Sequence, residues 1–216
     1  MGEVLADVHR DHGVEVITGI GVDSLEGNLK VDKVVLSDGR EIEANVVVIG
    51  IGVIPNTEWL DGSGLEIDNG VVCDETCLAA PNVVAAGDVA RWPNRLFDEV
   101  MRVEHWDNAV EQGMYAARRL LAGESQIDPY TPTPWFWTDQ FDRKIQLAGR
   151  TRPDDEIKII TGSVEERRFA TIYGREDRLV GILGFNRPRH VMQYKQMITD
   201  HVSWIDAIAY AEDQAS

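Results

Sequence analysis

The stretch from Val83 to Val89 constrains the fold most, because it joins a short apolar run to a glycine and an acidic residue. Small and β-branched side chains predict a short buried strand over 83–86, and Gly87 leaves room for a ligand or another backbone to approach. Asp88 follows at the end of the strand, where open α/β sheets bind cofactors and a carboxylate can accept hydrogen bonds from ligand hydroxyls. The pattern predicts a cofactor site, and the alternative is an ordinary turn closed by Gly-Asp.

A helix is predicted over 103–121 from the spacing of its apolar and small residues. The expected inner face is Trp106, Ala109, Val110, Gly113, Met114, Ala117 and Leu120 or Leu121. The start of a helix presents unpaired N–H groups and the positive end of the dipole, which stabilise negative charge. We therefore expect Glu104, His105 and Trp106 beside a cofactor ring. Each residue also has a simpler explanation. Glu104 is favoured at a helix start by the dipole alone, His105 is a surface residue, and Trp106 belongs to the core.

The segments 76–88, 91–93 and 102–113 together resemble the second flavin-contacting segment of FAD-dependent, NAD(P)H-linked ferredoxin and rubredoxin reductases. These proteins belong to the pyridine nucleotide-disulphide oxidoreductase superfamily. The run Phe136-Trp137-Thr138-Asp139-Gln140 is similar to the Phe-Trp-Ser-Asp-Gln signature that opens their C-terminal domain, with Thr138 in place of the serine.

The resemblance implies an α/β and α+β fold: the second half of a two-dinucleotide-binding flavoprotein reductase, followed by an α+β domain with an antiparallel sheet. It implies three domain segments. They are 1–55, the C-terminal part of the NAD(P)-binding domain; 56–126, the second segment of the FAD-binding domain; and 127–216, the C-terminal reductase domain. The implied cofactor-binding residues are Gly50, Gly52, Gly87, Asp88, Glu104, His105, Trp106 and Trp137. Trp137 is placed beside the flavin, and its alternative is a core tryptophan.

The implied activity is that of an oxidoreductase that passes electrons from NAD(P)H through FAD to a [2Fe-2S] ferredoxin or a rubredoxin. The flavin carries this chemistry, so neither a catalytic side chain nor a metal ligand is expected. Five basic residues are candidates to meet an acidic carrier, with scattered solvated charges as the alternative: Arg143, Lys144, Arg187, Arg189 and Lys195.

Both cofactor sites are expected to be incomplete, because the G-x-G-x-x-G loops that hold the two pyrophosphates do not occur in the sequence. We therefore expect a C-terminal portion of a reductase, which pairs with a missing N-terminal half or forms a homodimer. The alternative is a non-catalytic folded fragment or assembly module that cannot bind FAD alone.

The charge balance and the cysteines narrow the class of protein. A formal net charge of −16 argues against a nucleic-acid surface, which needs Lys and Arg to neutralise phosphates. The sequence holds no apolar run of the ~20 residues that span a bilayer, and residues 1–7 lack the features of a signal peptide, so we expect no membrane association and a cytoplasmic location. Cys73 and Cys77 do not form a C-x-x-C pair, and we expect buried thiols rather than a redox centre.

Hydrophobic periodicity predicts the remaining elements. These are a helix over 4–12, a strand over 14–18, a hairpin within 29–43, a fully buried strand over 46–49, amphipathic strands over 144–148, 156–160, 168–173 and 179–183, and a helix from 187 onward.

Overall fold

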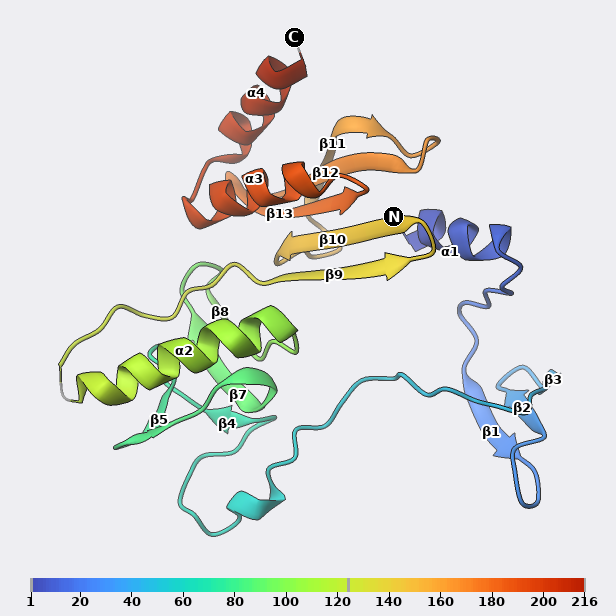
Figure 1. Cartoon of the computed structure of the whole chain (residues 1–216), viewed down its shortest axis with the longest axis horizontal. Coiled ribbons are helices and arrows are strands. Elements are labelled where there is room, and N and C mark those ends of the chain that lie inside the picture. The colour runs from blue at the N-terminus through green and yellow to red at the C-terminus, as the bar shows by residue number, and fades with distance from the viewer. Residues whose placement is uncertain (1, 124, 216) are drawn as a thin grey trace. The chain divides into compact units, whose positions relative to one another are not determined.

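The computed structural model describes residues 2–123 and 125–215 (Figure 1). It divides into two compact units, Met1–Val53 and Ile54–Ser216. None of the helices in the described ranges is both long enough and apolar enough to cross a membrane.

The first unit holds one helix and a small antiparallel sheet. Helix α1 spans Gly2–Asp11, and the sheet runs in the order β1 (Val22–Glu26), β2 (Lys33–Leu36) and β3 (Glu41–Glu43). The expected helix and the hairpin that turns through residues 37–40 are both confirmed. Asp38 shapes this turn, because its Oδ1 accepts the Arg40 N–H at 3.1 Å.

Two predicted strands of the first unit are wrong. Residues 14–18 and 46–49 form neither strand nor helix, and Val46 and Val48 are 80% and 91% exposed. A buried strand needs hydrogen-bonded neighbours, since its backbone N–H and C=O groups have no other partners inside a sheet. No strand in the described part of this unit pairs with either segment.

The second unit begins with short elements that lead to a long helix. They include two single-turn 3-10 helices, η1 and η2, and two small groups of paired strands. In chain order these elements are η1 (Glu58–Leu60), β4 (Val71–Val72), β5 (Leu78–Ala80), β6 (Val83–Val84), η2 (Gly87–Val89), β7 (Ala90–Asn94), β8 (Glu99–Met101) and α2 (Trp106–Ala122). Strand β7 lies between β4, to which it is parallel, and β8, to which it is antiparallel. Strand β6 is shorter than expected and pairs with β5, and Val83 is 38% exposed rather than buried.

The C-terminal part of this unit is a five-stranded antiparallel sheet with two helices. Its elements are β9 (Trp135–Gln140), β10 (Arg143–Gly149), β11 (Glu156–Ser163), β12 (Arg168–Arg175), β13 (Arg178–Phe185), α3 (Pro188–Thr199) and α4 (Trp204–Ala215). The strand order is β11-β12-β13-β10-β9, and α3 lies against β13 and β10 (Figure 1). The predicted antiparallel sheet and its following helix are confirmed.

One hydrophobic core runs through the second unit. Ile172 and Ile182 of the sheet are fully buried with Val191 and Ile198 of α3. Gly184 permits this packing, because a Cβ at that position would collide with the side chain of Val191. Each buried aliphatic side chain contributes about 1.5–3 kcal/mol, so this layer fixes α3 on the sheet.

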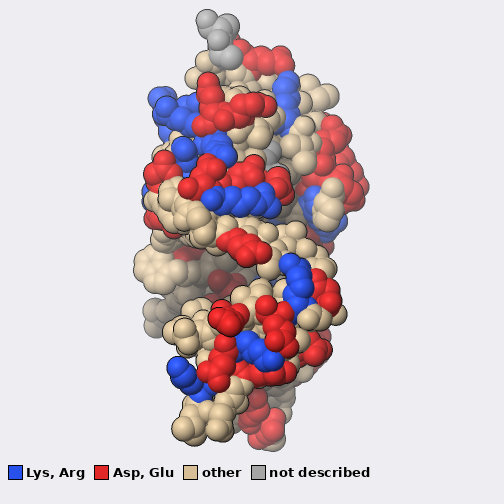
Figure 2. All heavy atoms as spheres, turned by 90° about the vertical axis from the view of Figure 1, so that its right-hand side faces the viewer, with Lys and Arg blue, Asp and Glu red and all other residues tan. Residues whose placement is uncertain are grey.

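Charged residues also join the two parts of the second unit. Glu99 on β8 pairs with Arg150, at 3.1 Å, and with Arg152, and both arginines follow β10. Elsewhere acidic and basic side chains are interspersed, as the face in Figure 2 shows. The Glu99 side chain is only 17% exposed, whereas the side chains of Arg150 and Arg152 are 50% and 46% exposed, so only the carboxylate of these ion pairs is shielded from water.

Candidate functional site

Gly87 and Asp88 form a tight turn between β6 and β7. Gly87 has a φ of +74°, in the left-handed region that favours glycine, and a Cβ there would lie 3.4 Å from the Cβ of Ala109 on α2. Its N–H donates to Oε1 of Gln112 at 2.9 Å. The turn is therefore held against α2, and both its conformation and the nearness of the helix favour glycine.

Asp88 is exposed at this turn. Its backbone carbonyl is held by a hydrogen bond, whereas its carboxylate is not. Its carbonyl oxygen accepts a hydrogen bond from Arg102 Nη1 at 2.9 Å. Arg102 Nη2 also pairs with Glu104 Oε1 at 2.6 Å. The Asp88 carboxylate has no hydrogen-bond or ion-pair partner in the described ranges. It is therefore available to accept hydrogen bonds from ligand hydroxyls.

The start of α2 carries several polar groups without partners. His105 is the N-cap residue, yet its side chain makes no capping hydrogen bond. Its Nδ1 and Oδ1 of Asp107 are buried, and neither has a hydrogen-bond partner among the residues described. Burial lowers the pKa of His105, and the nearby Asp107 carboxylate opposes this only in part, so the ring is neutral at pH 7. A ligand placed here can satisfy these atoms and the first N–H groups of the helix.

A cavity of about 320 Å³ opens at this helix start. It is lined by Glu104, His105, Trp106, Asp107, Phe136 and Trp137. The rings of Trp106 and Trp137 meet edge to face with centroids 6.2 Å apart, and those of His105 and Phe136 lie 5.2 Å apart. Trp106 is 74% exposed and Trp137 39% exposed, so neither is a core tryptophan. The structure thus brings together four residues that the sequence singled out.

A second hollow of about 420 Å³ shares Glu104, His105 and Phe136 with this cavity, and it also includes Arg102 and Arg150. Pockets that enclose a whole drug-sized ligand have volumes of roughly 300–1,000 Å³, so the cavity at the start of α2 lies at the low end of this range and suits a ring system rather than a whole dinucleotide. The open carboxylate, the uncapped helix and the aromatic wall fit the ring and ribityl side of FAD.

Gly50 and Gly52 lie in the first unit, outside its helices and strands. Apart from the adjacent residues of the chain, no atom of the described residues lies within 4 Å of a Cβ placed on either glycine. Their part in a cofactor site stays a prediction.

The expected inner face of α2 is wrong, and the true one holds residues that the sequence did not single out. The buried residues of the helix are Asn108, Gln112 and Ala116, whereas Met114 of the expected face is 54% exposed. These three residues are spaced four apart along the helix, and this spacing could have predicted that they lie on one face. Two polar side chains on that spacing argue for a hydrogen-bonded interior rather than an apolar one.

Asn108 and Gln112 belong to a buried hydrogen-bond network. Gln112 Nε2 donates to Cys77 Sγ at 3.4 Å, and its Oε1 accepts from Asn108 Nδ2 at 3.2 Å. The hydroxyl of Tyr130 donates to Asn108 Oδ1 at 3.2 Å. The network therefore ties the Gly87 turn to α2 and to the segment that leads into the C-terminal sheet.

The two cysteines are buried and free, as the sequence predicts. Burial raises the pKa of Cys73 to about 11 and that of Cys77 to about 12. Both thiols are therefore protonated at pH 7 and poorly nucleophilic, which does not suit a redox dithiol.

Comparison with known proteins gives matches along most of the chain. Residues 1–113 match the family model for pyridine nucleotide-disulphide oxidoreductases, and residues 135–215 match that for the reductase C-terminal domain. The chain is 36% identical to putidaredoxin reductase of Pseudomonas putida over 199 residues, which are 90% of this chain and 46% of that protein. It is 33% identical to rhodocoxin reductase of Rhodococcus erythropolis over 201 residues, which are 92% of this chain and 46% of the relative.

The fold is also similar to solved structures. The covalent putidaredoxin reductase–putidaredoxin complex matches with a TM-score of 0.84 and 35% identity, over 92% of this chain and 48% of that one. A ferredoxin reductase from Rhodopseudomonas palustris matches with a TM-score of 0.83 and 35% identity, over 93% and 50%. The chain thus spans about half the length of the curated relatives it matches.

Proposed function

This chain belongs to the pyridine nucleotide-disulphide oxidoreductase family, and we propose that it forms the C-terminal half of a reductase that passes electrons from NAD(P)H through FAD to a [2Fe-2S] ferredoxin or a rubredoxin. The observation that carries the proposal is the cavity at the start of α2, where Glu104, His105, Trp106 and Trp137 meet. The relatives named above are reductases of putidaredoxin and rhodocoxin, which supports an iron–sulfur protein as the partner.

Each residue of the site has a binding or shielding role in this proposal. The free Asp88 carboxylate accepts hydrogen bonds from the ribityl hydroxyls, and Gly87 allows the tight turn against α2 that presents this carboxylate. The uncapped N–H groups at the start of α2 stabilise negative charge on the pyrimidine edge of the ring. Trp106 and Trp137 cover the ring and limit the access of water from the side on which the protein partner docks.

When bound, FAD supplies the redox chemistry, taking a hydride from the nicotinamide and releasing electrons singly to the carrier. The protein residues bind and orient, and none is required as an acid, base or nucleophile. This agrees with the buried, protonated thiols of Cys73 and Cys77.

We also propose that an N-terminal portion completes both cofactor sites, with residues 1–55, 56–126 and 127–216 serving as the three domain segments. Exposed apolar residues of the first unit support this, because Val48 and Ile51 are 91% and 92% exposed and would be covered by added strands. A homodimer is the other arrangement that would cover them. A cytoplasmic location fits this activity, which draws on NAD(P)H.

A titration of the purified chain with FAD tests the proposal. We expect a saturable but weak change in the visible flavin band, since the ring side is present and the pyrophosphate loops are not. NADH is expected to leave the flavin oxidised in the isolated chain. No spectral change at any FAD concentration would support the alternative, a non-catalytic module that does not bind FAD.

A further inference from the structure

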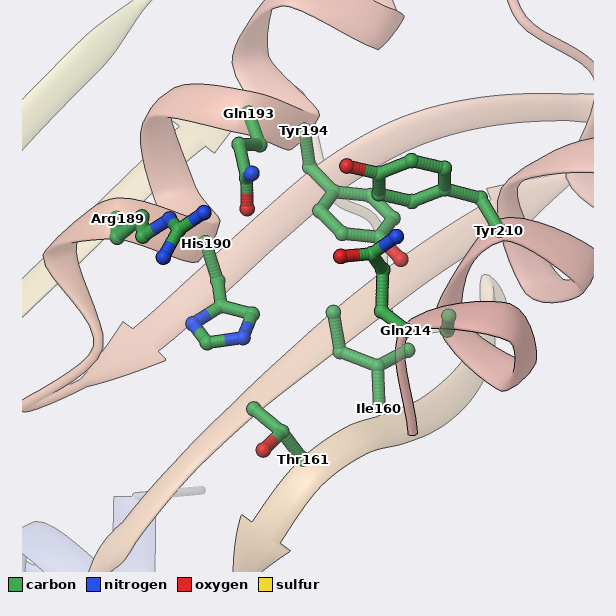
Figure 3. A pocket seen from close by; sticks show the side chains of 9 residues that line it. Ile160, Thr161, Arg189, His190, Gln193, Tyr194, Tyr210 and Gln214 are labelled. Atoms are coloured by element: carbon green, nitrogen blue, oxygen red, sulfur yellow. The ribbon is translucent and has the colours of Figure 1, made fainter. Parts of the chain in front are cut away.

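A separate cavity, distinct from the two near the start of α2, lies in the C-terminal part of the chain, between α3, α4 and β11. Its volume is about 220 Å³. Figure 3 shows the polar side chains that converge on it, which are Arg189, His190 and Gln193 from α3, Tyr210 and Gln214 from α4, and Thr161 from β11. None of these residues lines the cavity at the start of α2.

Of the polar groups that line this cavity, only Nδ1 of His190 is both buried and unpaired in the described ranges, whereas Arg189 and Gln214 are exposed to solvent. The side chains of Arg189, Gln193, Tyr210 and Gln214 form no hydrogen bond or ion pair with any residue in the described ranges. His190 Nδ1 is buried and likewise has no hydrogen-bond partner within those ranges. Buried polar atoms in folded proteins are nearly always paired, so an unpaired group beside a cavity indicates a ligand that supplies the missing partner.

The charge of the lining residues indicates the charge of the ligand. The chain holds 37 acidic and 21 basic residues, yet no Asp or Glu among the described residues lines this cavity. Arg189 and His190 lie in the first turn of α3, which has no acidic residue, and Arg187 is its N-cap. Cations at the positive end of a helix are unfavourable, and a bound anion would offset both the arginine charges and the dipole.

The size and the apolar part of the cavity limit the ligand further. A volume of about 220 Å³ corresponds to roughly seven waters at about 30 Å³ each, which is far too small for a dinucleotide. Ile160 and the rings of Tyr194 and Tyr210 form an apolar wall, with the two ring centroids 5.9 Å apart. This wall favours a compact organic body over a bare inorganic ion.

We propose that this cavity binds a small organic anion, whose carboxylate or phosphate head lies at the start of α3 against Arg189 and His190 and whose apolar body lies against Tyr210 and Ile160. The head group donates nothing and accepts hydrogen bonds from the guanidinium, the imidazole and the neighbouring amide of Gln193. This binding is independent of the flavin site and requires no cofactor.

Benzoate, phenyl phosphate and inorganic phosphate are suitable probes, titrated into the purified chain while NMR follows the His190 ring. We expect saturable shifts of this resonance with benzoate or phenyl phosphate, at lower concentrations than with inorganic phosphate. Arg189→Gln should weaken the organic probe about tenfold, the effect of losing one charge-assisted hydrogen bond. Arg118→Gln is the matched control, since it removes the same charge from an exposed position on α2 and should change nothing.

Gln193→Leu gives a second test that keeps the charge and removes only the amide, and it too should weaken binding. Three results would overturn the proposal. They are no saturable shift with either organic probe, equal weakening in Arg189→Gln and Arg118→Gln, or inorganic phosphate binding as tightly as phenyl phosphate. All titrations omit FAD, so a failure here is distinct from a failure of the flavin site.

Discussion

Replacing Gln112 with Leu tests whether one buried side chain holds the Gly87 turn in place. Gln112 is completely buried, and its Oε1 accepts hydrogen bonds from the Gly87 N–H at 2.9 Å and Asn108 Nδ2 at 3.2 Å. Leucine has a similar size but accepts neither bond, so two buried donors lose this acceptor. Asn108 Nδ2 keeps a longer contact of 3.3 Å with the Val103 carbonyl. An unpaired buried donor costs about 1–3 kcal/mol, and we expect the free energy of unfolding to fall by about 2–4 kcal/mol.

Urea unfolding followed by circular dichroism measures this loss. Hydrogen exchange of the Gly87 amide should also speed up by more than the global loss explains, because the amide loses its own acceptor. Gln196→Leu is the matched control: it removes a 2.9 Å hydrogen bond to Asp200 on an exposed face of α3, and a change within about 0.5 kcal/mol is expected. Equal stabilities of the two variants, or unchanged exchange at Gly87, would refute the reasoning.

Three further predictions concern charge, thiols and the aromatic cavity. Burial raises the pKa of Glu99, but hydrogen bonds from its two arginines outweigh this and lower it. Its stabilising effect is therefore present above the unfolded pKa of about 4.3 and lost as the pH falls through the folded value, so Glu99→Gln should flatten this part of the urea-midpoint profile. Ellman's reagent should label neither cysteine in the folded chain and both after unfolding, because both thiols are buried. Trp106→Leu should weaken riboflavin binding in difference spectra, whereas Trp59→Leu should not, although these tryptophans are 74% and 75% exposed.

The C-terminal sheet could be predicted from the sequence because its strands carry their own partners. Strands β12 and β13 are joined by a short turn at residues 176–177, and both strands are apolar at most positions. The pairing of neighbouring strands and the burial of their apolar side chains therefore predict the same structure. Residues 46–49 are equally apolar, but no strand within the described ranges pairs with them, and Val46, Val48 and Ile49 are exposed. An apolar run alone predicts burial and not the partner that supplies it.

The candidate site was predictable in part. Gly87 and Asp88 give only a weak signal by themselves, because a Gly-Asp pair also closes ordinary turns, and the family resemblance is what strengthens it. The meeting of Trp106 with Trp137 spans 31 residues, and only the family resemblance indicated it. The sequence made Arg189 a candidate to meet a protein carrier. It does not indicate that α4 places Tyr210 beside Arg189 to form a cavity.

A comparison of three ligands tests the central claim, that this chain carries the ring side of a flavin site without its phosphate side. Riboflavin, FAD and ADP are titrated into the chain while tryptophan fluorescence reports on Trp106 and Trp137. We predict that riboflavin and FAD bind with similar affinity, within about threefold, and that ADP neither binds nor competes. FAD binding far more tightly than riboflavin, or displacement of FAD by ADP, would contradict the account.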